Sequence, residues 1–235
     1  MSVSYNPSIT TNGLILYVDA ANARSYPGSG TTWTDVSGYG NNGTLVNSPT
    51  FSSTNGGILG FNGSSSYVSI PDSASLRPAN ITVCTWAKLS SFNNPNTGII
   101  VKPQNSTPGG AWSNPYLSWM IRVEDSGFTL SVAMGSSTTY YAARNAYGFS
   151  TNVWYFFTLT YDGTTLKGYV NAVPISSLTQ TTTINYTTNP VQLAAMNYSL
   201  EYLNGNIALT QIYDRALSQN EIARNFNAHR ARFGV

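Results

Sequence analysis

The stretch GNIALTQIYDRALSQNEI at residues 205–222 decides the fold of this chain. Residues 207–212 alternate in the way that suits a pleated strand, with successive side chains on opposite faces. Ser218 is followed three residues later by Glu221, which is the spacing of a capping box at the start of a helix. The stretch therefore predicts a strand, a tight corner and a short capped helix.

The expected helix carries one apolar stripe. Leu217 and Ile222 are spaced for a hydrophobic staple around its first turn. Ile222 and Phe226 are four residues apart, so they share one face of the helix. We therefore expect this stripe to dock on a β-sheet, and we expect His229 to offset the negative charge at the end of the helix.

The rest of the chain consists of short apolar segments separated by turn signals, which is typical of an all-β fold. Asp162 and Gly163 join two such segments and tolerate the positive φ angles of a type I′ hairpin turn. Strands are predicted at residues 14–19, 58–61, 67–70, 81–89, 98–102, 116–123, 128–134, 154–161, 165–171, 191–196 and 206–213. This pattern predicts two antiparallel sheets packed face to face, with Trp86, Trp154, Phe156 and Phe157 filling the core between them.

Composition excludes several classes of protein. The chain has 235 residues, of which 41% are hydrophobic and 9% charged, so it is too apolar to be disordered and long enough for one β-sandwich domain. A net charge of +2 is too small for a nucleic-acid partner, and no window approaches the roughly 20 apolar residues of a membrane span. Cys84 is the single cysteine and cannot form an internal disulfide. Residues 1–12 are polar and predict an N-terminal arm, with one domain at residues 13–235.

Motifs spread over nearly the whole chain carry a resemblance to a known family. They are GLILYVDA at 13–20, WTDVSG at 33–38, NNGTL at 41–45, FNG at 61–63, YVSIP at 67–71, ITVCTW at 81–86, WY at 154–155, TYDGT at 160–164 and the closing stretch above. In this order and spacing they resemble laminin-G-like domains of the concanavalin A-like lectin/glucanase superfamily. The resemblance implies a jelly-roll sandwich with one short C-terminal helix. The opening motif and residues 225–234 also resemble domains in structural proteins of tailed bacteriophages.

The inventory of reactive groups argues against an enzyme. A glycosidase needs two carboxyl groups that face each other across the sugar. The only adjacent acids are Glu124 and Asp125, which lie close to Gly127 and are interpreted as part of a polar turn. His229 is the only histidine, so a Ser-His-Asp arrangement would have to be built at the end of the helix. We expect no catalytic residues.

A calcium site remains open at this point. Asp19, Asp35 and Asn41 lie on or near the first long loop and could converge as oxygen ligands. The resemblance implies that an acid follows Gly-x-Ile in the closing strand, where it can serve a calcium site. This chain has Ala208 there, which removes one charged ligand. We therefore expect neither a cofactor nor a structural metal.

A binding surface is expected where aromatic side chains lie in loops, because their flat apolar faces and polar edges suit sugars. The alternative is that these rings pack in the core or in a subunit interface. The candidate glycan- or partner-binding residues are Trp112, Tyr140, Tyr141, Arg144, Tyr147, Tyr198 and Tyr202.

Together these features predict a non-enzymatic protein of the virion surface, a capsid decoration or cement protein. Its expected partners are capsid or other virion proteins, further copies of the chain and a surface glycan. Residues 1–7 lack the basic and apolar regions of a signal peptide, so we expect assembly in the host cytoplasm. The alternative is a glycan-binding lectin module, on a phage host-recognition appendage or on a cell surface.

Overall fold

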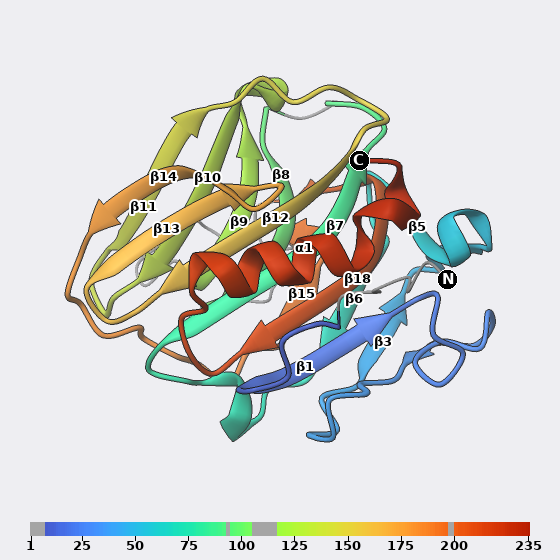
Figure 1. Cartoon of the computed structure of the whole chain (residues 1–235), viewed down its shortest axis with the longest axis horizontal. Helices are drawn as coiled ribbons and strands as arrows, with labels where there is room; N and C mark the ends of the chain where they lie inside the picture. Colours follow the sequence, from blue (N-terminus) through green and yellow to red (C-terminus); the bar gives the residue numbers. More distant parts are fainter. Residues whose placement is uncertain (1–7, 93–94, 105–116, 197–199) are drawn as a thin grey trace, which may run out of the picture.

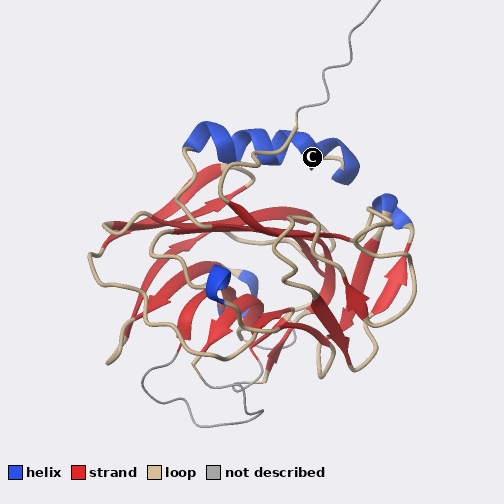
Figure 2. Cartoon of the chain, turned by 90° about the horizontal axis from the view of Figure 1, so that it is seen from below, coloured by secondary structure: helices blue, strands red, loops and turns tan. Residues whose placement is uncertain are grey.

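Two antiparallel β-sheets and one α-helix form three stacked layers in the computed structural model, which describes residues 8–92, 95–104, 117–196 and 200–235 (Figures 1 and 2). We name the sheet next to the helix sheet A and the other one sheet B. Figure 2 shows the layers in profile, with the helix on the far side of sheet A from sheet B. The predicted two-sheet, jelly-roll architecture with one C-terminal helix is confirmed.

Each sheet contains strands that are distant in the sequence. Sheet A runs β14 (Val173–Thr179), β13 (Thr165–Val170), β12 (Trp154–Tyr161), β7 (Ile81–Leu89), β18 (Asn204–Tyr213), β5 (Ile58–Asn62), β4 (Thr50–Ser52), with β1 (Leu14–Asp19) also paired to β18. Sheet B runs β11 (Tyr140–Ala146), β10 (Thr129–Gly135), β9 (Leu117–Glu124), β8 (Thr97–Pro103), β15 (Val191–Leu193), β6 (Tyr67–Ile70), β3 (Gly43–Val46), β2 (Thr32–Trp33). A separate pair is formed by β16 (Ala195–Met196) and β17 (Glu201–Tyr202). Short 3₁₀ turns lie at Thr54–Gly56, Ala74–Leu76 and Asp125–Gly127.

The main core lies between the two sheets. Trp119 of β9 and Phe157 of β12 are both fully buried there, together with the inward-facing aliphatic side chains of their neighbours. Each such large side chain contributes about 1.5–3 kcal/mol through the apolar surface that it removes from water. Because strand side chains alternate, this packing fixes which residues of each strand face outward.

A second core lies on the outer face of sheet A, under helix α1 (Gln219–Phe233). Trp86 stacks on Phe233 at 4.3 Å and on Phe226 at 5.5 Å between ring centroids, and it also contacts Phe156. The prediction that Trp86, Trp154 and Phe156 fill the sandwich interior is wrong, because these rings point outward and are covered by the helix. Phe157 is in the interior as predicted.

Helix α1 begins as the sequence predicts. The Ser218 hydroxyl accepts a hydrogen bond from the Glu221 amide, and the Glu221 carboxylate accepts one from the Ser218 amide, which completes the capping box. Leu217 and Ile222 are both buried in the core under the helix, as expected for the staple. Arg215 forms an ion pair with Glu221, which helps to lower the pKa of that carboxyl to about 2.

The other end of α1 differs from expectation. His229 is half-buried beside Tyr17 and the Asn225 carbonyl, and burial lowers its pKa, so its ring is neutral at pH 7 and does not offset the helix terminus. Arg232 in the last turn supplies positive charge instead. It pairs with Asp19 at 2.8 Å and donates to the backbone carbonyls of Asn55 and Gly57.

Residues 8–12 lie against the same layer. The Thr10 amide donates to the Asn225 side chain, and its carbonyl accepts from the Tyr213 hydroxyl. Arg215 donates to the carbonyl of Asn12. The described part of the predicted arm is thus fastened to α1 and β18, while residues 1–7 lie outside the described residues. The boundary at residue 12 stays a prediction.

The hairpin between β12 and β13 is built differently from the predicted type I′ turn. Gly163 has a φ of +90°, but Asp162 is not in the left-handed region. Instead, the Asp162 carboxylate accepts hydrogen bonds from the amides of Thr164 and Thr165 and closes an Asx-type turn.

Gly205 shows why the closing stretch begins with glycine. A Cβ at this position would lie 2.1 Å from the carbonyl oxygen of Lys88 in β7. The close approach of β18 and β7 therefore excludes a side chain here.

Replacing Trp86 by alanine removes the ring on which the helix stacks. We expect the free energy of unfolding to fall by about 3–5 kcal/mol, because a large cavity is left between sheet A and α1. Urea denaturation followed by circular dichroism measures this loss. Phe128→Ala is the control, because Phe128 is 59% exposed and should cost little. Equal losses in the two variants would contradict the account of the helix layer.

Candidate functional site

Charged side chains gather on the outer face of sheet B. In β9, Ile121 and Val123 point into the main core, so the residues between and after them, Arg122 and Glu124, point outward. Arg144 of β11 lies opposite Ser131, and Ser131 lies opposite Arg122, which places the two arginines in one cross-strand row. Three further side chains, those of Glu124, Tyr140 and Glu201, contact these arginines. We name the group the Arg122 cluster, and its members are Arg122, Glu124, Tyr140, Arg144 and Glu201.

The cluster is held together by directional bonds. Arg122 donates to Glu124 at 3.0 Å and, through a second nitrogen, to Glu201 at 3.2 Å. Arg144 donates to the other oxygen of Glu124 at 2.9 Å and to the Tyr140 hydroxyl at 3.2 Å. The Arg144 guanidinium also lies 5.8 Å from the centre of the Tyr140 ring. Two planar guanidinium groups therefore fix the orientation of a carboxylate and of an aromatic ring.

The members of the Arg122 cluster differ in exposure, so the buried ones hold the exposed one in position for contact with a ligand. The side chains of Arg122 and Glu124 are only 8% and 10% exposed, whereas that of Arg144 is 40% exposed. Desolvation alone would raise the pKa of Glu124, but hydrogen bonds from Arg122 and Arg144 outweigh it and lower that pKa. Glu124 therefore stays ionised, and its charge orients Arg144 toward solvent.

The structure brings together two of the predicted site residues, Tyr140 and Arg144. Tyr141 faces the other way and packs against the main core. Tyr147 lies apart, with its ring against Phe149 at 4.6 Å. Tyr202 is 8% exposed in β17. Trp112 and Tyr198 lie outside the described residues.

Sequence reasoning missed Arg122, Glu124 and Glu201. The interpretation of Glu124 as part of a polar turn is wrong, because Glu124 is the last residue of β9 and is buried. The alternation Trp119, Ile121, Val123 against Arg122 and Glu124 is a signal that could have placed both charges on one strand face.

The carboxylates that were candidate calcium ligands in and near the first long loop bond to other groups of the chain. Asp35 accepts hydrogen bonds from the amides of Tyr17, Ser37 and Asn41 and from the Ser37 hydroxyl. Asp19 is paired with Arg232. These carboxylates therefore act as loop and helix anchors. Within the described ranges, no three His, Cys, Asp or Glu side chains are grouped as metal ligands.

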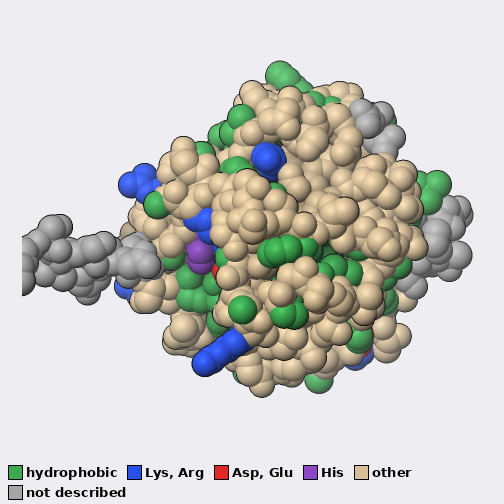
Figure 3. Space-filling view, turned by 90° about the vertical axis from the view of Figure 1, so that its right-hand side faces the viewer, with side chains coloured by type: hydrophobic (Ala, Val, Ile, Leu, Met, Phe, Trp, Pro, Cys, Tyr) green, Lys and Arg blue, Asp and Glu red, His purple; other side chains and the backbone are tan. Residues whose placement is uncertain are grey.

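The face drawn in Figure 3 consists mainly of backbone and of side chains that are neither charged nor hydrophobic, with separate hydrophobic and basic groups between them. This agrees with the low charge content of the chain. Among the described residues, no helix has the length and apolar character needed to cross a bilayer.

With the fold and this cluster established, comparison with known proteins gives the family. Laminin_G_3, described as the concanavalin A-like lectin/glucanases superfamily, matches residues 62–223. The chain is a member of the Laminin_G_3 family. The matched region runs from the end of β5 into the first turns of α1, so it includes most of both sheets. No curated protein sequence matches the chain.

Solved structures share this fold at low sequence identity. Domain 4 of AbnA, a GH43 extracellular arabinanase from Geobacillus stearothermophilus in complex with arabinotriose, is 19% identical with a TM-score of 0.68, over 89% of this chain and 96% of that one. The binding domain of botulinum neurotoxin DC in complex with SialylT is 17% identical with a TM-score of 0.70, over 93% of this chain and 52% of that one. The same domain in complex with rat synaptotagmin II is 17% identical with a TM-score of 0.72, over 94% and 52%. The chain thus spans about half the length of the neurotoxin binding domains, and these likenesses show the fold.

The acid response of stability tests the Arg122 cluster. Because the pKa of Glu124 is lowered in the folded state, its ionised form stabilises the fold above its ordinary pKa of 4.5, and this contribution is lost as the pH falls. We expect Glu124→Gln to lower the melting temperature at pH 7 and to lose less stability than the wild type between pH 6 and pH 3. Asp125→Asn, at the exposed neighbouring acid, is the control. Parallel pH profiles for wild type and Glu124→Gln would contradict the cluster.

Proposed function

We propose that the chain is a non-catalytic glycan-binding module that contacts its sugar with the Arg122 cluster, chiefly through Tyr140 and Arg144. The observation that carries this proposal is the half-exposed Arg144, oriented by a buried carboxylate and placed beside an aromatic ring. Membership of a lectin-like family supports it, as does the fold shared with a domain solved in complex with arabinotriose.

The chemistry of the cluster suits sugars. A guanidinium donates hydrogen bonds to ring and hydroxyl oxygens, and a carboxylate accepts them from sugar hydroxyls. The face of a tyrosine offers apolar contact for the C–H groups of a sugar ring. Because Glu124 and Arg122 fix Arg144 and the surrounding groups in advance, little side-chain entropy is lost on binding.

The same contacts argue against hydrolysis. A glycosidase keeps one carboxyl protonated as a general acid, which requires a raised pKa. Glu124 has a lowered pKa and two arginine partners, and Glu201 is paired with Arg122. The arrangement therefore supports recognition of a sugar without cleavage.

Capsid decoration, a virion location and a relation to phage proteins stay predictions. Among the related solved structures, domain 4 of AbnA is in complex with arabinotriose, and the neurotoxin binding domain is in complex with SialylT or with rat synaptotagmin II. They favour the lectin alternative over the capsid role.

A glycan array with the fluorescently labelled chain tests the proposal. Neutral and acidic oligosaccharides, arabinotriose among them, identify the strongest ligand, and isothermal titration calorimetry then measures its affinity. We expect Arg144→Ala and Tyr140→Ala each to weaken binding at least tenfold, equal to about 1.4 kcal/mol.

Arg224→Ala provides the matched control, because Arg224 is exposed on α1, on the opposite side of the molecule. It should bind like the wild type, and all three variants should retain a cooperative thermal transition. Undiminished binding by Arg144→Ala, or no binding to any glycan, would contradict the proposed function.

A further inference from the structure

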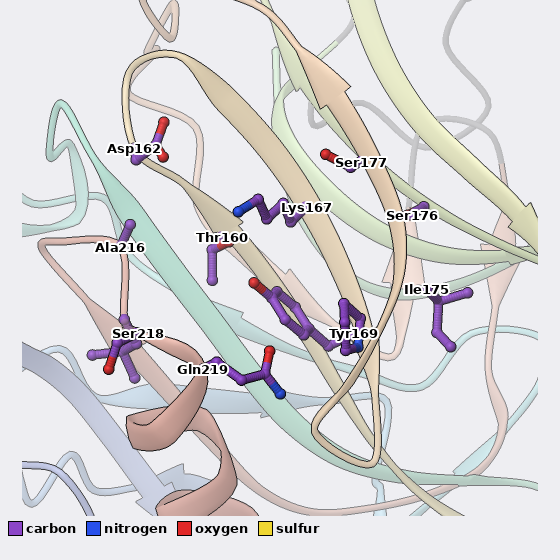
Figure 4. A pocket seen from close by; sticks show the side chains of 12 residues that line it. Thr160, Asp162, Lys167, Tyr169, Ile175, Ser176, Ser177, Ala216, Ser218 and Gln219 are labelled. Carbon is purple, nitrogen blue, oxygen red and sulfur yellow. The ribbon is translucent and has the colours of Figure 1, made fainter.

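A pocket of about 400 Å³ lies on the outer face of sheet A, next to the start of α1 (Figure 4). This volume is in the range of sites for small molecules. The helix covers the outer face over β7 and β18 but leaves part of β12, β13 and β14 free, and the pocket occupies that part (Figures 1 and 4).

The floor of the pocket is a polar row across three strands. Lys167 of β13 is paired in register with Thr160 of β12 and with Ser177 of β14. Their neighbours Leu159 and Leu166 point into the main core, so the row points outward. An ammonium group and two hydroxyl groups thus stand side by side on the pocket floor.

Two of the lining residues present hydroxyl groups to the pocket that are not bonded to other parts of the described chain. Tyr169 is 5% exposed and Thr160 is 4% exposed, and neither hydroxyl has a hydrogen-bond partner within the described residues. Figure 4 shows the Tyr169 hydroxyl directed into the pocket toward Thr160 and Lys167. Desolvation alone would raise the pKa of Asp162 at the rim, but hydrogen bonds from Thr164 and Thr165 and the positive charge of Lys167 lower it. The two hydroxyls and the Lys167 ammonium therefore offer hydrogen bonds to a polar occupant of the pocket.

The rim determines the charge and the kind of occupant. Asp162 stands at one edge, where one carboxylate oxygen already accepts bonds from Thr164 and Thr165. One ammonium facing one rim carboxylate suits a monoanion better than a doubly charged phosphate. Gln219 adds an amide, whose nitrogen already donates to the Ala172 carbonyl, while Pro174 adds apolar surface for the C–H groups of a sugar ring.

We propose that this pocket binds the carboxylate-bearing unit of an acidic saccharide, with the carboxylate at Lys167 and Tyr169. The pocket and the Arg122 cluster lie on different sheets, so this site does not depend on the proposed function. An occupied pocket would allow the module to hold an acidic glycan at a second place.

Titrations followed by ¹H–¹⁵N NMR test the site with four probes at equal ionic strength. The probes are D-galacturonate, N-acetylneuraminate, D-galactose as the neutral counterpart, and sodium sulfate. We expect either sugar acid to shift the backbone amides of Thr160, Lys167 and Ser177 in a saturable way. Galactose and sulfate should shift them at least fivefold less at the same concentration.

Two variants identify the contacts. Lys167→Gln and Tyr169→Phe should each weaken the response to the sugar acid at least fivefold. Lys88→Gln, the matched control, changes a lysine that lies over the Trp154 ring and should respond like the wild type. Because the Tyr169 hydroxyl has no partner to lose, Tyr169→Phe should keep the melting temperature of the wild type.

The alternatives give distinct results. Equal shifts with sulfate and with sugar acids would overturn the carboxylate assignment, and equal shifts with galactose would overturn the need for an anion. No shift at the pocket with either sugar acid would overturn the site. A lower melting temperature for Tyr169→Phe with unchanged binding would show that the hydroxyl is structural.

Discussion

The packing of α1 on the outer face of sheet A is the interaction on which the rest of the structure depends. Every residue of β7 except Lys88 is buried, so this strand is apolar on both faces and the outer one must be covered. Trp86 meets that need by stacking with Phe226 and Phe233 from successive parts of one helix face. Without the helix, the hydrophobic surface under it would be exposed to water.

The helix is also fixed by polar contacts that join distant parts of the chain. Its capping box fixes the start, and Arg232 ties the end to Asp19 in β1. Asn225, in the middle, bonds to both Thr10 and Tyr213. These bonds join the beginning and the end of the described chain in the helix layer, so the closing segment holds β1 in sheet A and residues 8–12 against it.

The Arg122 cluster and the pocket at Lys167 are not covered by the closing segment, and they differ in how their polar groups are bonded. On sheet B the charges are paired with one another, so the Arg122 cluster presents a rigid array of hydrogen-bonding groups. Beside the start of α1, the Thr160 and Tyr169 hydroxyls are not bonded to other described residues, so a ligand in the pocket at Lys167 can supply their partner. In a chain with only 9% charged residues, both concentrations of polar groups are exceptions to the neutral surface.

Local patterns were sufficient to predict the fold but not the binding face. Alternation predicted most long strands, and the spacing of Ser218 and Glu221 predicted the start of the helix, because both signals depend on neighbours in the sequence. The strands β11 and β14 were missed, since Tyr140–Ala146 and Val173–Thr179 lie at sheet edges and have no continuous apolar face. The Arg122 cluster joins β9, β11 and β17, and only the tertiary fold brings Glu201 to Arg122. Sequence spacing cannot show such a contact.

The most direct measurement of the central claim is a crystal structure of the chain with the glycan that binds it most tightly. The account predicts sugar density on the outer face of sheet B, in contact with the Arg144 guanidinium and the Tyr140 ring, with the bond between Arg122 and Glu124 intact. Density for that glycan only on another surface, with Arg144 and Tyr140 still in contact with solvent, would contradict the account.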